Sequence, residues 1–103
     1  MNLTSYKRSG SGATTLKVLK YMGKQRVPVT GKQVADGMGL PYGTVMCHLA
    51  TIYDEGLINV VGESFELGMG MALFYSHRKA RNETELARIE REMDLLIMNR
   101  LEV

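Results

Sequence analysis

The segment from residue 42 to residue 51 carries side chains that could read the hydrogen-bonding surface of another molecule. Tyrosine and threonine hydroxyls can bond phosphate oxygens or base edges, and a methionine side chain can contact the methyl group of thymine. The candidates for such contacts are Tyr42, Thr44, Met46, Cys47, His48 and Thr51. The segment contains no Lys or Arg, although arginine to guanine is the commonest specific contact. The alternative interpretation is therefore that these six side chains form an ordinary solvent-exposed helix surface with no partner.

Positive charge is concentrated in the first third of the chain, outside that segment. Residues 1–35 contain seven Lys and Arg and no acid, whereas residues 36–76 contain five acids and no Lys or Arg. Clustered Lys and Arg side chains suggest a polyanionic partner, because their binding releases counterions from phosphate groups. Lys32 stands where a helix is expected to start and is suited to a phosphate contact. Lys7 and Arg8 could enter a minor groove from a flexible arm, or could belong to a solubilising tail.

Capping and turn signals predict the helices that must position these side chains. Apolar spacing, with Leu16, Leu19 and Met22 on one face, predicts a helix from residue 14 to Gly23. The next segment, Val27–Val29, is expected to be a short extended link, because the residue before a proline avoids the helical conformation. The Thr30 to Gln33 segment is a capping box that opens a second helix. Gly39 ends that helix with a positive φ, and Pro41 suits the first turn of a third. The apolar side of this third helix consists of Val45, Leu49 and Ile52.

Three positions in these two helices have the spacing of a helix–turn–helix. Ala35, Gly39 and Val45 fall at relative positions i, i+4 and i+10. The small residue lets the helices approach, the glycine makes the sharp turn, and the β-branched residue packs into the angle. Alternating residues after Gly56 then predict a hairpin with its turn at residues 62–64. Ile58 and Val60 could share one face of the sheet, and Phe65 and Leu67 are expected in the same core. Three helices followed by a hairpin is the order of a winged helix–turn–helix, whose second motif helix can lie in the DNA major groove.

The same landmarks resemble the DNA-binding domain of IclR-type transcriptional regulators over about residues 13 to 101. The matching segments are Thr30–Ala35, Gly39–Val45, Leu49–Ile52, Glu55–Ile58 and Phe65–Gly68. The resemblance implies a dimer on operator DNA, with residues from Tyr42 to Thr51, Gly43 included, facing the groove. The sequence departs from the family pattern at Gly43, where serine is usual, at Cys47, where arginine is usual, and at Glu63, where the wing is usually basic. The family's large effector-sensing domain has no counterpart, so we expect no small-molecule effector.

The last part of the chain predicts two helices and a means of self-association. One helix is expected from Gly68–Gly70 to about Arg81, and a capping box at Asn82–Glu85 is expected to open another, reaching to about Leu101. An apolar stripe on the last helix consists of Leu86, Ile89, Met93, Leu96 and Ile97. An amphipathic helix of this length must bury its stripe, either on its own domain or against a second chain. We favour dimerisation, because a core this small cannot easily absorb it.

Other classes of protein are disfavoured by composition. The single cysteine, Cys47, cannot form an internal disulfide, and with two histidines no zinc cluster is expected. No apolar run approaches the roughly 20 residues of a membrane helix, and no signal peptide is evident. No nucleophile–base–acid set is found. We therefore expect a cytoplasmic protein that is not an enzyme, with no cofactor, no metal and no membrane partner.

Together these patterns predict a mainly α protein with a small β-hairpin, a winged helix–turn–helix plus a C-terminal amphipathic helix. The expected organisation is a flexible basic arm (1–12), the winged domain (13–76), and a helical linker with the dimerisation helix (77–103). The predicted function is sequence-specific binding of double-stranded DNA by a homodimeric transcriptional regulator. The alternative is a winged-helix protein-interaction module, an adaptor or antirepressor, that does not read DNA sequence.

Overall fold

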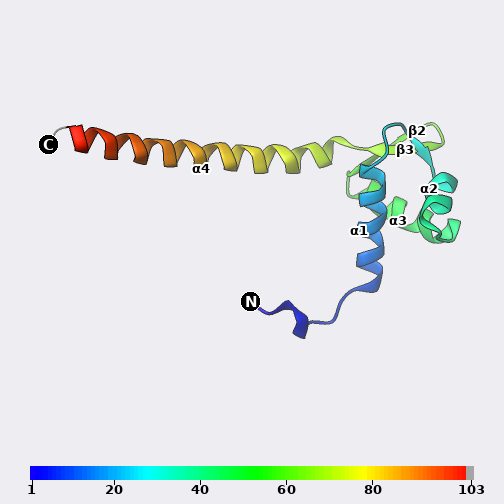
Figure 1. Ribbon diagram of the computed structural model, residues 1–103. Coiled ribbons are helices and arrows are strands. Elements are labelled where there is room, and N and C mark those ends of the chain that lie inside the picture. Colours follow the sequence, from blue (N-terminus) through cyan, green and yellow to red (C-terminus); the bar gives the residue numbers. More distant parts are fainter. Residues whose placement is uncertain (102–103) are drawn as a thin grey trace. The chain divides into compact units, whose positions relative to one another are not determined.

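The computed structural model describes residues 1–101, which divide into two units, Met1–Met71 and the segment from Ala72 onward. Figure 1 shows the order of elements along the chain. They are a 3-10 turn (Leu3–Ser5), α1 (Gly10–Gly23), β1 (Val29–Thr30), α2 (Gly31–Met38), α3 (Tyr42–Asp54), β2 (Ile58–Val61), β3 (Ser64–Leu67) and α4 (Met69–Leu101).

Helix α1 starts earlier than the sequence pattern predicted, at Gly10. Ser9 is the N-cap, and its hydroxyl accepts a hydrogen bond from the Gly12 amide at 3.1 Å. This capping satisfies an amide at the helix start and extends the helix into the segment predicted to be a flexible arm. The buried residues of α1 are Val18 and Met22. Leu16, which was expected on the same apolar side, is 58% exposed.

The turn between α2 and α3 forms as predicted. The Thr30 hydroxyl accepts from the Gln33 amide at 3.1 Å, and the Gln33 side chain accepts from the Thr30 amide at 2.9 Å. Gly39 has a φ of 67°, a left-handed conformation that glycine adopts without strain. Pro41 is the N-cap of α3, one position before the predicted first turn.

A single small core joins α1, α2, α3 and the strands. Its members, each less than one tenth exposed, are Val18, Met22, Val29, Val34, Ala35, Val45, Leu49, Ile52 and Ile58. All three residues predicted for the inner side of α3 are among them. The exposed side of α3 is thereby fixed by the packing of the opposite side.

The predicted hairpin is part of a three-stranded antiparallel sheet. Strands β2 and β3 pair with Val60 opposite Phe65, and the short strand β1 joins the other edge of β3, with Val29 opposite Phe65. The sequence pattern had indicated only an extended link at this place. The hairpin turn lies at Gly62, which has a φ of 63°. We refer to the β2–β3 hairpin as the wing.

Helix α4 runs unbroken for 33 residues, so the predicted separation into two helices near Asn82 is wrong. The Thr84 hydroxyl donates to the Ala80 carbonyl at 3.0 Å, a bond inside a helix rather than a cap at its start. No Gly or Pro occurs between Met71 and Leu101, and nothing else there would stop a helix. With this correction, the elements form a winged helix–turn–helix plus a C-terminal helix, which confirms the predicted fold class.

The core makes one stability difference directly testable. We expect Leu49→Ala to lower the free energy of unfolding by about 2–5 kcal/mol, because it empties a fully buried site that cannot collapse completely. Leu16→Ala, at an exposed site of α1, is the matched control and should change it by less than about 1 kcal/mol. Thermal or urea unfolding followed by circular dichroism measures both. Equal losses in the two variants would contradict the assignment of the two sides of α1 and α3.

Candidate nucleic-acid interface

The exposed side of α3 carries most of the residues singled out for contact with a partner. Tyr42, Gly43, Thr44, Cys47 and Thr51 are all exposed. The spacing of Thr44, Cys47 and Thr51 places them along one side of the helix. The Thr51 hydroxyl donates to the Cys47 carbonyl at 3.0 Å, which leaves its oxygen able to accept from a partner. This side of α3 is therefore polar, exposed and free of bulky charge.

His48 and Met46 are half-buried and have partners within the domain. The His48 Nδ1 atom is hydrogen-bonded to the Thr15 hydroxyl of α1 at a distance of 2.8 Å. Met46 lies on the side of α3 that meets the start of α2, where a side chain at Gly31 would collide with the Met46 sulfur. Sequence reasoning placed both residues with the groove-facing set, but the fold gives each a packing role as well.

A groove lies between the start of α2, the start of α3 and the wing. It has a volume of about 630 Å³. Residues from all three elements line it, among them Gly31, Lys32, Tyr42, Met46, Val60 and Phe65. Val60 is 49% exposed on the wing. The predicted core position of Phe65 is confirmed in part, since Phe65 also packs against the core. The predicted core position of Val60 is wrong, because strand alternation does not say which residues line a groove at the edge of a sheet.

Charge is distributed unevenly around this surface. Lys32 is exposed beside the groove, and Glu63 lines the groove from the wing. The only Asp, Glu, Lys or Arg within α3 is Asp54, its last residue. In the N-terminal segment, the Arg8 guanidinium donates to the Leu3 and Tyr6 carbonyls at 2.7 and 3.3 Å, while Lys7 is exposed. The positively charged side chains therefore belong to α2 and to the N-terminal segment, and α3 itself carries none.

Three further lysines are exposed on α1 and at its C-cap, and the sequence suggested no role for them. Lys17, Lys20 and Lys24 recur at spacings of three and four, so they share one side of the helix. The buried residues Val18 and Met22 occupy the opposite side. Their exposure and spacing make α1 a basic helix on its solvent side.

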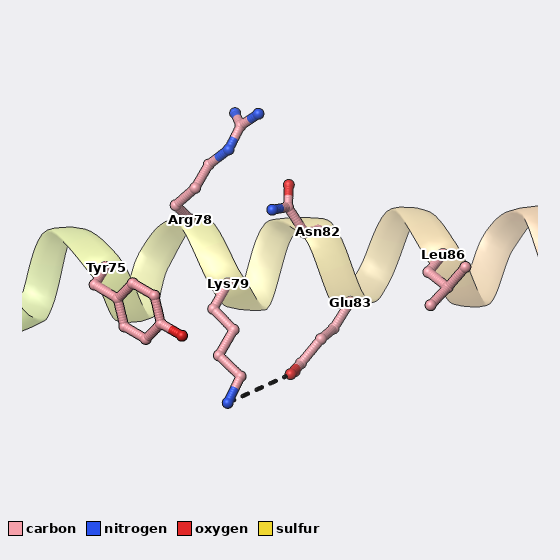
Figure 2. A pocket seen from close by; sticks show the side chains of 6 residues that line it. All are labelled: Tyr75, Arg78, Lys79, Asn82, Glu83 and Leu86. Carbon is pink, nitrogen blue, oxygen red and sulfur yellow. Dashed lines mark ion pairs between the residues drawn. The ribbon is translucent and has the colours of Figure 1, made fainter.

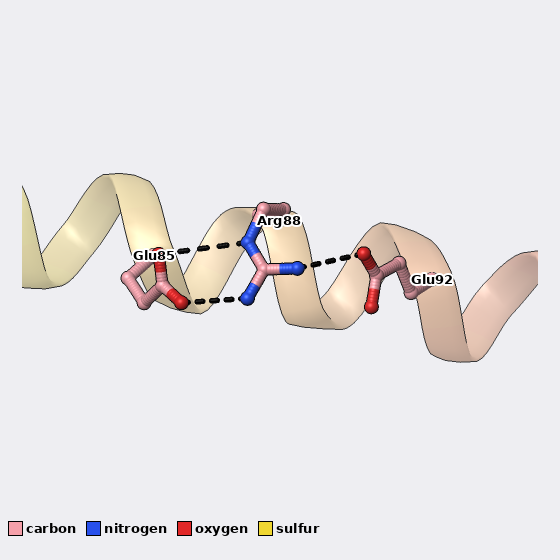
Figure 3. Close-up of polar contacts among 3 residues, drawn as sticks. All are labelled: Glu85, Arg88 and Glu92. Atoms are coloured by element: carbon pink, nitrogen blue, oxygen red, sulfur yellow. Dashed lines mark hydrogen bonds and ion pairs between the residues drawn. The ribbon is translucent and has the colours of Figure 1, made fainter.

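Helix α4, taken by itself, exposes its predicted stripe. The exposed fractions of Leu86, Ile89, Met93, Leu96 and Ile97 are 56%, 42%, 57%, 59% and 54%. Beside the stripe, Arg88 bonds Glu85 at 2.6 Å and Glu92 at 2.7 Å (Figure 3). The hydrogen bond to Glu85 and, next, the negative charge of Glu92 raise the pKa of Arg88 above its usual value. Such solvated pairs support the helix only weakly.

The same side of α4 continues toward its N-terminus as a shallow depression of about 250 Å³. Figure 2 shows that its lining comes entirely from successive turns of this one helix. The lining residues are Tyr75, Arg78, Lys79, Asn82, Glu83 and Leu86. Lys79 and Glu83 are paired across one turn at 4.0 Å. The depression and the apolar stripe meet at Leu86, so they form one continuous side.

Among the described residues, none of the helices is apolar over a long enough stretch to cross a bilayer.

The fold is similar to one known from crystallography, while no protein-family model and no curated protein matches the chain. A solved structure, the crystal structure of an IclR family transcriptional regulator from Brucella abortus, superposes with a TM-score of 0.58. The superposition covers 75% of this chain at 20% sequence identity. This chain spans only 31% of the length of that solved chain. The likeness supports the winged helix–turn–helix fold.

Proposed function

We propose that this protein is a transcriptional regulator that binds double-stranded DNA sequence-specifically as a homodimer. The observation that carries the proposal is the exposed side of α3. Val45, Leu49 and Ile52 hold α3 on the core, while Thr44 and Thr51 are left exposed. In a helix–turn–helix, this second helix is the one that enters the major groove. Hydroxyl groups at these positions can bond base edges or phosphates.

The proposed contacts to the DNA backbone come from outside α3. Lys32 stands beside the groove between α2, α3 and the wing, where a phosphate next to the major groove would lie. Lys7 and Arg8 precede α1 and would reach the backbone or the minor groove. Tyr42, Gly43, Met46, Cys47 and His48 complete the proposed contact set, with His48 and Met46 offering only their half-exposed edges.

The proposed homodimer forms through the α4 stripe. Each of its five side chains is about half exposed in one copy, so burying it contributes about 1 kcal/mol. Ten such side chains in a pair contribute about 10 kcal/mol, comparable to the roughly 4–15 kcal/mol that association costs. The pair is therefore expected to be modest in affinity and strengthened by DNA. Two recognition helices about 34 Å apart predict a palindromic site.

A second candidate function is an adaptor or antirepressor that binds protein rather than DNA. It is favoured by the absence of Lys and Arg from α3 and by Glu63 beside an apolar stretch of the wing, Val60 and Val61, that is exposed at 49% and 45%. Protein interfaces favour such apolar and aromatic surface over clustered cations.

Binding to random duplex DNA across a salt series separates the two candidates. A regulator should lose affinity steeply with salt and should then select a palindromic sequence from a random pool. Lys32→Gln is expected to reduce the slope of log K against log salt by about 0.9 for each phosphate that the lysine neutralises. Arg91→Gln, on α4, is the control and should leave the slope unchanged. A flat salt dependence with no selected sequence would support the adaptor instead.

A further inference from the structure

We propose that two copies of α4 pair side by side in the same direction and in register, with Asn82 of one copy facing Asn82 of the other. The inference rests on the proposed homodimer and adds its orientation. A parallel pair brings the N-terminal ends of both α4 helices together, and with them the two winged domains that precede α4. An antiparallel pair would place these ends at opposite ends of a rod about 50 Å long, since α4 has 33 residues at about 1.5 Å each.

The side chains that face the second copy recur at alternating spacings of four and three. The seam, as we call this row, consists of Tyr75, Lys79, Asn82, Leu86, Ile89, Met93 and Leu96. This 3.5-residue period keeps a row of side chains in contact with a neighbouring helix along a left-handed supercoil. The N-terminal part of the seam, from Tyr75 to Leu86, lines the depression of Figure 2. The C-terminal part, from Leu86 to Leu96, belongs to the apolar stripe. One continuous contact surface therefore spans most of α4.

The polar seam residues distinguish the two directions. In the parallel pair, every seam residue meets its own copy, so Asn82 meets Asn82 and its amide can donate to the other amide's carbonyl. Lys79 also meets its own copy there, with Glu83 of the same helix 4.0 Å from its ammonium group. Polar residues in such a seam fix register at a cost in stability. In the antiparallel pair that matches the apolar residues, Leu86 meets Leu96 and Ile89 meets Met93. Asn82 then lies opposite position 100 and gains no amide partner.

The charges beside the seam favour the same direction. In the parallel pair, Arg78 lies next to Glu83 of the second copy, and this attraction occurs twice. Glu85 comes near Glu90 of the second copy, but Arg88 already holds Glu85 at 2.6 Å and offsets its charge. The antiparallel pair brings Glu90 against its own copy and Glu92, which Arg88 also holds at 2.7 Å, against its own copy, with no Arg78–Glu83 contact. Of the two directions, the parallel pair is therefore the one that gains an attraction beside the seam.

Cysteine cross-linking of the full-length chain tests the orientation. In a Cys47→Ser background, Asn82→Cys is expected to give a covalent dimer under mild oxidation, because facing seam positions bring the two Cβ atoms close enough for a disulfide. A mixture of Leu86→Cys and Leu96→Cys copies should give only like-with-like dimers, which mass spectrometry identifies. Mixed Leu86→Cys with Leu96→Cys dimers would overturn the parallel pair while leaving the homodimer intact. Monomers by light scattering before oxidation would overturn the proposed homodimer as well.

A charge exchange tests the same pairing without cysteines. Arg78→Glu and Glu83→Arg are each expected to weaken dimerisation about tenfold, because each places like charges opposite one another. The double variant restores opposite charges across the seam and should return to within about threefold of the parent dissociation constant. Sedimentation equilibrium measures all four proteins. Two weakened single variants without recovery in the double variant would overturn the parallel arrangement.

Discussion

Ile89→Asp combined with Met93→Asp is expected to convert the protein into monomers and to weaken binding to a palindromic DNA site at least 100-fold. The two positions lie at the centre of the α4 stripe and are 42% and 57% exposed in a single copy. In the pair they would be buried, and an unpaired carboxylate taken out of water costs several kcal/mol. A monomer also binds each half-site independently. It therefore loses the high effective concentration that the second winged domain of a dimer has at the second half-site. Light scattering and DNA titration measure the two effects.

A matched control separates loss of the seam from general damage to α4. Leu95→Asp with Met98→Asp makes the same chemical change on the same helix, at positions that are 60% and 56% exposed and lie away from the seam by helical periodicity. This variant should remain dimeric. A dimer that persists in the Ile89/Met93 variant would place the interface elsewhere. Loss of the dimer in both variants would show that the contact surface is wider than the stripe.

Thr44→Ala combined with Thr51→Ala is expected to abolish the preference for a selected DNA sequence while leaving the fold intact. Both side chains are exposed on α3, so their removal creates no cavity. Removing one hydrogen bond to a base edge reduces discrimination by about 1 kcal/mol or more, and two together amount to about 30-fold. Binding to random duplex DNA should change little, since phosphate contacts do not carry sequence information. Competition between the selected and a scrambled duplex measures the effect.

The control for this variant is Thr84→Ala. Thr84 bonds the carbonyl four residues before it at 3.0 Å, as Thr51 does at the same distance, so both substitutions remove the same local bond from an exposed helix. Only the α3 variant should lose sequence preference. An unchanged preference in the Thr44/Thr51 variant would remove α3 from the groove and favour the adaptor.

Most of the winged domain could be predicted from short segments of sequence, because its signals are local. The Thr30–Gln33 capping box and the left-handed Gly39 each depend on residues at most four apart, so their signals can be recognised in a short segment of sequence. The buried side of α3 could also be predicted, since its apolar residues follow the helical period. The start of α1 was missed because the Ser9 cap lies in a segment of serines and glycines that is equally typical of a flexible arm.

The residue pattern near Asn82 shows why helix breaks are harder to predict than helix starts. Asn82–Glu85 has the composition of a capping box, but Thr84 and Glu85 are equally well accommodated inside a helix, where they bond Ala80 and Arg88. A cap forms only if something stops the preceding helix. The sequence contains the decisive signal, because no Gly or Pro follows Gly70.

By itself, the sequence determined the order of the first three helices and the hairpin, the turn between α2 and α3 and the inner side of α3, because hydrogen bonds and helical periodicity within a few residues decide them. The tertiary structure alone decided that Val29–Thr30 becomes a third strand beside β3, that His48 bonds Thr15 and that Leu16 is exposed. Each of these depends on contacts between segments far apart in the chain. The local propensity of a segment does not depend on such contacts. Several strand pairings and side-chain positions are locally acceptable, and only the packing of the whole domain selects one of them.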